Sequence, residues 1–150
     1  MLGRLAVKRS EYGIVFRKNL VIQRNGNPIL YAYKDQPLTK ALKKLVTMAG
    51  EDTKNPIWNV TPFVDAPGTY AYGSYFFEWE REWRKVGDFT FTTDEVAFLI
   101  IPEQLHILAK DFFIDARENN LGPSYDCPFI DAHWTWEKLK PLIPTETSQA

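Results

Sequence analysis

The segment Val96-Ala97-Phe98-Leu99-Ile100-Ile101, which Pro102 follows directly, decides the fold class. An apolar run of this length is too short for most helices, and its β-branched residues favour a strand that is buried on both faces. Pro102 suits the first position of a helix. The sequence therefore predicts a central strand that leads straight into a helix.

Two amphipathic helices accompany this strand. The first ends at Gly50, and the second begins after Pro102 and ends in a polar turn at residues 119–122. Their apolar positions, at helical spacing, are Leu38, Leu42, Leu45, Val46 and Ala49 in the first and Leu105, Leu108, Phe112 and Ala116 in the second. We interpret the lysines of the first helix, Lys40, Lys43 and Lys44, as its solvated face. The pattern predicts an α+β fold in a single domain over residues 1–150, with a mixed or antiparallel sheet.

Shorter elements fill the rest of the chain. Residues 12–16 and 29–33 are apolar and β-prone, and Phe89 and Phe91 alternate with threonines, so all three predict strands. Asp131 is placed to cap a last helix. The remaining expectations are a short helix over residues 17–24, a turn over 25–28, a packed loop over 51–69 and a disordered tail over 145–150.

Residues 76–84 form the most unusual segment, with two Trp, two Phe, three Glu and two Arg in nine positions. As a strand, the segment alternates: Phe77, Trp79, Arg81 and Trp83 point one way, and Glu78, Glu80, Glu82 and Arg84 the other. As a helix, it stacks Trp79 over Trp83 and pairs Glu80 with Arg84. We favour a strand beside residues 96–101, with Phe77, Trp79 and Trp83 in the core and the charged residues on the functional face.

Composition limits the function. The chain has 150 residues, 45% of them hydrophobic, and a formal net charge of −1. This balance argues against a broad DNA-binding surface and leaves only a local basic patch open for nucleic acid. Cys127 is the single cysteine, so no disulfide can form within the chain, and a reducing compartment is expected. With no apolar run near the roughly 20 residues of a membrane helix and no signal peptide, we expect a cytoplasmic protein.

Metal and thiol chemistry find little support in the sequence. The two histidines, His106 and His133, and Cys127 match no recognised zinc spacing. Cys127 has no basic neighbour to lower its pKa. The glycines are isolated from one another, so there is no phosphate-binding loop. We expect no metal and no required cofactor.

The carboxylates of residues 78–82 allow two interpretations. Neighbouring carboxylates ionise together only when cations or donors lie close, and Arg81 and Arg84 are the local partners through bidentate pairs. The first interpretation is an ion-pair network that holds the sheet together. The second is a pocket carboxylate between aromatic walls, which stacks on a planar ring and orients a hydroxyl.

Four segments, taken in order, carry a resemblance to a known family. They are Tyr12-Gly13-Ile14-Val15-Phe16-Arg17-Lys18, Gly26-Asn27-Pro28-Ile29-Leu30-Tyr31, Phe77-Glu78-Trp79-Glu80-Arg81-Glu82-Trp83-Arg84 with Gly87-Asp88-Phe89, and Val96-Ala97-Phe98-Leu99-Ile100-Ile101-Pro102-Glu103. Over about residues 11–105 the chain resembles the AbiGi-type abortive phage-resistance family. That family also carries an N-terminal strand with a Cys-Phe-Thr-Glu-like motif, which this chain lacks, so the resemblance is to a truncated or minimal member.

The resemblance implies a role in bacterial anti-phage defence, as a partner-binding component or one half of a toxin–antitoxin-like pair. The family is described as the antitoxin side, and the sequence itself leaves open which side this chain takes. It also implies a cognate protein partner encoded nearby. We therefore take Glu78, Arg84, Trp83, Tyr12 and Arg17 as candidate binding residues. A purely structural or interaction domain is the third interpretation of the same residues.

A second resemblance, to ADP-ribosyltransferases, rests on the Glu-x-Glu pattern of residues 80–82. It implies an enzyme that uses NAD, with Glu82 and Glu80 as the catalytic residues. Glu82 would hold the nicotinamide ribose, Glu80 would orient the acceptor, and Tyr12 or Trp83 would stack on the nicotinamide.

Overall fold

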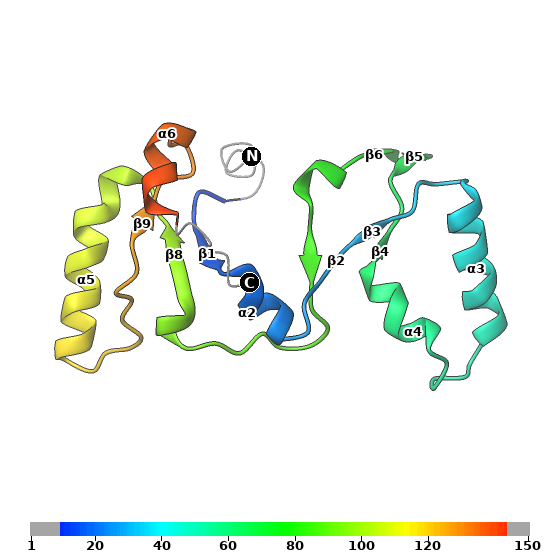
Figure 1. Ribbon diagram of the computed structural model, residues 1–150, viewed down its shortest axis with the longest axis horizontal. Coiled ribbons are helices and arrows are strands. Elements are labelled where there is room, and N and C mark those ends of the chain that lie inside the picture. The colour runs from blue at the N-terminus through cyan, green and yellow to red at the C-terminus, as the bar shows by residue number, and fades with distance from the viewer. Residues whose placement is uncertain (1–9, 144–150) are drawn as a thin grey trace, which may run out of the picture. The chain divides into compact units, whose positions relative to one another are not determined.

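The computed structural model describes residues 10–143, which group into two compact units (Figure 1). The terminal unit joins residues 10–20 to residues 90–143, and the central unit is Val21–Phe89. Both contain helices and short strands, which confirms the predicted α+β class. A single globular domain over residues 1–150 stays a prediction, and the predicted tail at 145–150 lies outside the described residues.

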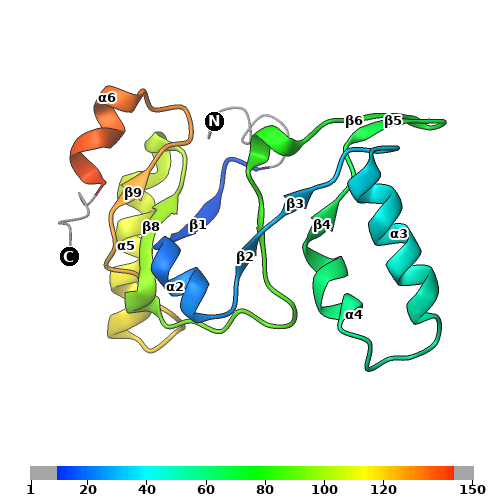
Figure 2. The ribbon, with the colours of Figure 1, turned by 45° about the vertical axis from the view of Figure 1, so that its right-hand side comes forward.

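The terminal unit is built on a three-stranded sheet in the order β1-β8-β9. The central strand, β8 (Val96–Ile100), pairs antiparallel with β1 (Gly13–Phe16) and parallel with β9 (Phe129–Ile130), so the sheet is mixed. Helix α5 (His106–Glu118) connects β8 to β9 and lies beside them in both views (Figures 1 and 2). The predicted central strand is confirmed: Val96, Phe98 and Leu99 are buried.

Asp131 fixes the start of α5 rather than the start of the last helix. Its carboxylate accepts hydrogen bonds from the backbone N–H of Glu103, at 2.6 Å, and of His133, at 2.7 Å. Glu103 begins the 3₁₀ turn Glu103–Leu105 that leads into α5. The predicted role as cap of the last helix is wrong, because Thr135 occupies the N-cap position of α6 (Trp136–Leu139). Asp131 instead serves the earlier helix, because β9 brings it back beside that turn.

Helix α5 buries less of its apolar stripe than its spacing predicts. Ala116 is buried, and Phe113 packs edge-on against Phe129 of β9 with ring centroids 6.0 Å apart. Leu108 and Phe112, predicted for the core, are 67% and 63% exposed. The prediction is wrong at these two positions because the helix turns the side that carries Phe113 and Ala116 toward the sheet.

The central unit contains three two-stranded ribbons and two helices. One ribbon is parallel and two are antiparallel. They are β2 (Asn27–Pro28) with β7 (Trp83–Arg84), β3 (Leu30–Tyr31) with β4 (Val64–Asp65), and β5 (Gly68–Tyr70) with β6 (Gly73–Tyr75). The helices are α3 (Pro37–Ala49) and α4 (Ile57–Val60), and α2 (Lys18–Gln23) spans the boundary between the two units. The predicted loop over 51–69 thus contains a helix and strand residues.

Helix α3 ends as predicted. Pro37 stands at its start, and Gly50 ends it with a left-handed φ of 53°. Thr39 is buried, and its hydroxyl lies 2.8 Å from the carbonyl oxygen of Ala32, which holds the helix against the preceding strand. Leu38 and Leu45, predicted for the core stripe, are 45% and 49% exposed, so the buried face is narrower than the sequence indicates.

Residues 76–84 form neither the continuous strand nor the helix expected. A 3₁₀ turn covers Glu78–Glu80, Arg81 has a left-handed φ of 50°, and only Trp83–Arg84 is strand. The left-handed residue breaks both periodicities, so the alternation of side chains along the segment is lost. The strand's partner is β2, whereas β8 pairs with β1 and β9. Trp83, predicted for the core, is 37% exposed.

The predicted strand at Phe89 and Phe91 is also wrong. Residues 89–92 are not part of any strand in the described structure, and Phe91 packs edge-on against Phe16 of β1 at 4.8 Å between ring centroids. Thr92 and Glu95 then form a reciprocal capping box around the turn Thr93–Glu95 that precedes β8. Because the threonine is committed to this cap, its backbone does not extend a sheet.

Replacing Asp131 tests the turn before α5. Asp131→Ala leaves two amides without their acceptor, so we expect a loss of about 2 kcal/mol in the free energy of unfolding at neutral pH. Burial alone would raise the pKa of Asp131, but the two amide bonds more than offset burial and lower it below 3.8. The carboxylate's contribution is therefore present above pH 3.8 and lost as the pH falls through the lower folded pKa.

Urea unfolding of wild type and variant at neutral pH and at about pH 2 measures this difference. The matched control is Asp126→Ala, which removes an exposed ion pair with Arg117 and should cost less than about 1 kcal/mol. Equal losses for the two variants, or a difference that does not shrink at low pH, contradict the proposed role of Asp131.

Candidate functional site

Four polar side chains of the central unit meet where its three ribbons end. Arg84 lies on β7, Glu82 just before it, Asp65 at the end of β4 and Tyr75 at the end of β6. These four residues are called the Arg84 cluster below. They come from sequence positions up to 19 apart, so no local motif contains them all.

Arg84 is the centre of the cluster. Its Nε lies 2.6 Å from Glu82 Oε1 and its Nη2 lies 3.1 Å from Glu82 Oε2, a bidentate pair. Nη2 is also 3.1 Å from Asp65 Oδ2, and Nη1 donates to the carbonyl oxygen of Pro62 at 3.3 Å. The hydrogen bonds and charge of Glu82, and then Asp65, raise the pKa of Arg84, although burial opposes them. The predicted pairing of Arg84 with a neighbouring carboxylate is confirmed.

Two tyrosines complete the hydrogen bonding. The hydroxyl of Tyr75 donates to Asp65 Oδ2 at 2.5 Å, and the backbone N–H of Glu82 donates to the hydroxyl of Tyr31 at 3.1 Å. The bond to Asp65, helped by burial, raises the pKa of Tyr75 to about 12. The cluster is therefore set up as a network of fixed donors and acceptors in which each oxygen of Glu82 already faces Arg84.

The other predicted site residues are divided between the units. In the central unit, Tyr33 donates to Glu78 Oε1 at 3.1 Å, and this bond raises the pKa of Tyr33. Glu80 ends the 3₁₀ turn, on the same segment. Tyr12 is 58% exposed just before β1, and Arg17 follows β1, so both belong to the terminal unit.

The sequence did not reveal Asp65, Tyr75 or Tyr33 as members of this region. Asp65 fell in a predicted loop, and no periodicity links it to Arg84. The only signal in the sequence was the surplus of carboxylates over arginines in residues 76–84, which indicated pairing but not the distant partner.

The geometry favours the ion-pair interpretation of Glu82. Both of its oxygens lie against one guanidinium, and a carboxylate held in this way is already neutralised and oriented. The catalytic roles of Glu82 and Glu80 and the use of NAD stay predictions.

The four motif segments pair two by two. The first forms β1 and the fourth forms β8, which are antiparallel neighbours, with Gly13 opposite Ile100. The second forms β2 and the third ends in β7, with Pro28 opposite Trp83. Gly26 belongs to the second motif for a steric reason: a Cβ there would lie 2.4 Å from the Val21 side chain. The motifs therefore mark the strand pairs on which each unit is built.

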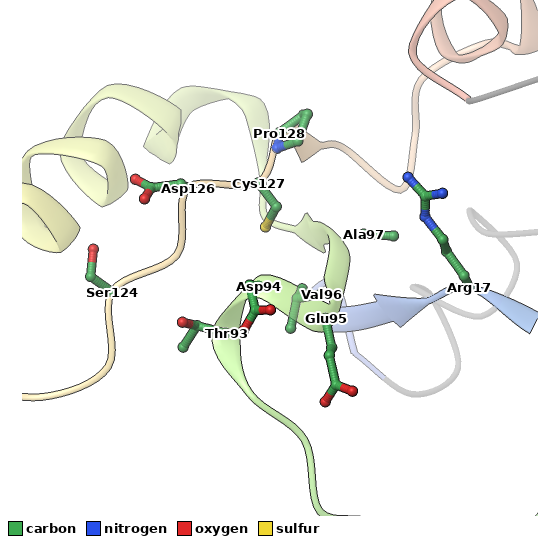
Figure 3. Close-up of a pocket in the computed structure, with 10 residues that line it drawn as sticks. All are labelled: Arg17, Thr93, Asp94, Glu95, Val96, Ala97, Ser124, Asp126, Cys127 and Pro128. Carbon is green, nitrogen blue, oxygen red and sulfur yellow. The ribbon is translucent and has the colours of Figure 1, made fainter. Parts of the chain in front are cut away.

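The terminal unit has a pocket of about 370 Å³ between the start of β8 and the loop before β9 (Figure 3). Arg17, predicted as a binding residue, lines it together with Asp94, Glu95, Asp126 and Cys127. The Cys127 sulfur points toward the turn that carries Asp94 (Figure 3). Burial raises the pKa of Cys127, so its sulfur stays a neutral thiol at neutral pH.

The described residues contain neither a metal-binding cluster nor a membrane-spanning helix. Across residues 10–143, no group of three His, Cys, Asp or Glu side chains is placed to hold a metal ion. Over the same residues, no helix has the length and apolarity needed to cross a membrane.

These features define a small α+β protein in which paired motif strands support a polar network. Comparison with known families then identifies the family. A family model described as "Putative abortive phage resistance protein AbiGi, antitoxin" matches residues 2–122, so the chain belongs to the AbiGi family. The resemblance found in the sequence is confirmed. The search of curated proteins and the search of solved structures gave no match.

Substitution of Arg84 tests its role as the centre of the cluster. Arg84→Ala leaves Glu82 and Asp65 without their cation, and we expect the free energy of unfolding to fall by about 2 kcal/mol, a value that allows for partial exposure. Arg84→Lys should recover little of this loss, because an ammonium cannot form the bidentate pair.

Urea unfolding followed by tryptophan fluorescence measures both variants. Arg117→Ala is the matched control, since Arg117 forms its pair with Asp126 on an exposed surface. Full recovery by lysine would show that charge alone, rather than the bidentate geometry, holds the cluster.

The raised pKa of Tyr75 can be measured directly. Ultraviolet titration of wild type minus Tyr75→Phe isolates one of the seven tyrosines, and its phenol should ionise near pH 12 rather than near 10. Linkage gives the direction of the pH dependence. The Tyr75–Asp65 bond stabilises the fold fully below pH 10, and this stabilisation is lost as the pH rises toward 12. A difference curve centred near pH 10, with the circular dichroism of the fold unchanged, contradicts the bond.

Proposed function

We propose that this protein is the antitoxin component of an abortive phage-resistance system and that it acts by binding a partner protein encoded beside it. The observation that carries the proposal is the family match over residues 2–122. The net charge of −1 supports a protein partner over a broad nucleic-acid surface.

The segment over residues 76–84 is our candidate contact surface. The bidentate pair of Arg84 and Glu82 and the β2–β7 ladder fix its end. Beside these anchors it presents Phe76, 48% exposed, and Trp83, 37% exposed. Rigid aromatic side chains that bury area at low entropic cost are the commonest energetic centres of protein interfaces.

The polar rim of this surface also supports binding. Arg81 is exposed on its left-handed turn, and Glu78 and Glu80 lie on the adjoining 3₁₀ turn. Interfaces commonly place charged groups of this kind around an aromatic centre, where they steer association and set the register.

Truncation of Trp83 tests the proposal. The tagged protein is co-expressed with the protein encoded by the adjacent reading frame, and the complex is purified and titrated. Trp83→Ala should raise the dissociation constant about 30-fold, as expected for an interface centre worth about 2 kcal/mol.

Trp136→Ala is the matched control, because Trp136 is 58% exposed on α6 in the other unit. Its dissociation constant should stay within about twofold of wild type. If the wild-type protein binds the neighbouring product but Trp83→Ala binds equally well, the contact surface is wrong. If wild type does not bind it at all, the antitoxin proposal fails.

A further inference from the structure

Helix α5 presents an exposed face that combines apolar and acidic side chains. Ile107 is 79% exposed, Leu108 67% and Phe112 63%. Asp111 and Asp115 follow Ile107 at intervals of four residues and are also exposed. The acidic row therefore runs beside the apolar row of Leu108 and Phe112. These five residues are called the α5 face.

Nearby charges leave this face acidic. Arg117 of the same helix is committed to Asp126, with Nη2 2.9 Å from Oδ1. Asp115 accepts a hydrogen bond from Asn119 at 2.7 Å, which fixes the position of its carboxylate on the helix surface. Lys110 is also exposed, but it lies on the side of the acidic row that faces away from Leu108 and Phe112.

Helix α3 presents the complementary pattern. Leu38 is 45% exposed, Leu45 49% and Met48 72%. Lys40 and Lys44 are exposed and precede Met48 at intervals of four residues, beside the row of Leu38 and Leu45. These five residues are called the α3 face. Its helix contains no acidic residue.

We propose that the α5 face of one molecule docks on the α3 face of a second copy of this chain. In this contact the apolar rows pack against each other, and the carboxylates of Asp111 and Asp115 meet the ammonium groups of Lys40 and Lys44. Scattered exposed apolar residues are ordinary, but contiguous rows edged by opposite charges on two helices are typical of interaction surfaces. The inference does not depend on the antitoxin assignment.

The size of the contact sets its strength. Each helix has 13 residues and is therefore about 20 Å long. One helix pair of this length falls at the small end of specific interfaces, so the association should be in the micromolar range. Because the two faces differ, the contact is heterologous and either closes into a ring or continues as an open chain.

Charge reversal with rescue tests the contact. Sedimentation velocity of the full chain is measured from about 1 to about 500 µM, at about 50 and about 500 mM salt. Wild type should associate with rising concentration, and more weakly at high salt. Asp111→Lys with Asp115→Lys should be monomeric, as should Lys40→Glu with Lys44→Glu. An equimolar mixture of these two variants should associate again, through their unaltered faces or through their reversed ones.

A fold-matched control separates docking from net charge. Lys54→Glu changes an exposed lysine outside both faces and should associate as wild type does. If a double variant unfolds, Asp111→Lys and Lys44→Glu singly carry the same test. Wild type that stays monomeric at every concentration overturns the inference, as does association that survives charge reversal. A monomer whose α5 face binds the neighbouring gene product also overturns it and assigns the face to that partner.

Discussion

One guanidinium joins the pieces of the central unit. Two-stranded ribbons are not stable by themselves, and this unit contains three of them. Arg84 on β7 contacts Asp65 on β4, and Asp65 accepts a hydrogen bond from the hydroxyl of Tyr75 on β6. A single connected network thus touches one strand of every ribbon. The ribbons supply local pairing, and the cluster supplies the contacts between them.

The strands of the terminal unit are held together by apolar packing instead. Its β8 strand has partners on both sides, so the central strand could be predicted from six consecutive apolar residues. The motif over residues 76–84 could not be predicted in the same way. Its alternation of side chains matched a strand and its spacing matched a helix. The left-handed backbone of Arg81 interrupts both patterns, so neither element forms over the whole segment. A backbone conformation at one non-glycine residue leaves little trace in the sequence around it.

The pairing of carboxylates with arginine could be predicted from the sequence, but the identity of the residues that form the site could not. Three glutamates beside two arginines indicated pairing, and Glu82 pairs with Arg84 as that chemistry requires. Asp65 comes from a segment that the sequence presents as loop, and Tyr75 from one for which the sequence predicts no element. Only the folding of three ribbons brings them to the guanidinium. Long-range partners of this kind follow from topology, which periodicity within one segment cannot supply.

The two helices show that helical periodicity alone does not determine which apolar residues are buried. Both α3 and α5 have the spacing of a core stripe, yet Leu45 and Leu108 remain exposed while Ala49 and Ala116 are buried. A small unit has too little interior to cover the full width of a helix's apolar stripe, so only the residues at its centre are enclosed. The rest of the stripe stays at the surface, where the cost of its hydration favours any arrangement that covers it. Apolar positions beyond the interior's capacity therefore indicate surface available for association, and the charges beside them determine which surface fits.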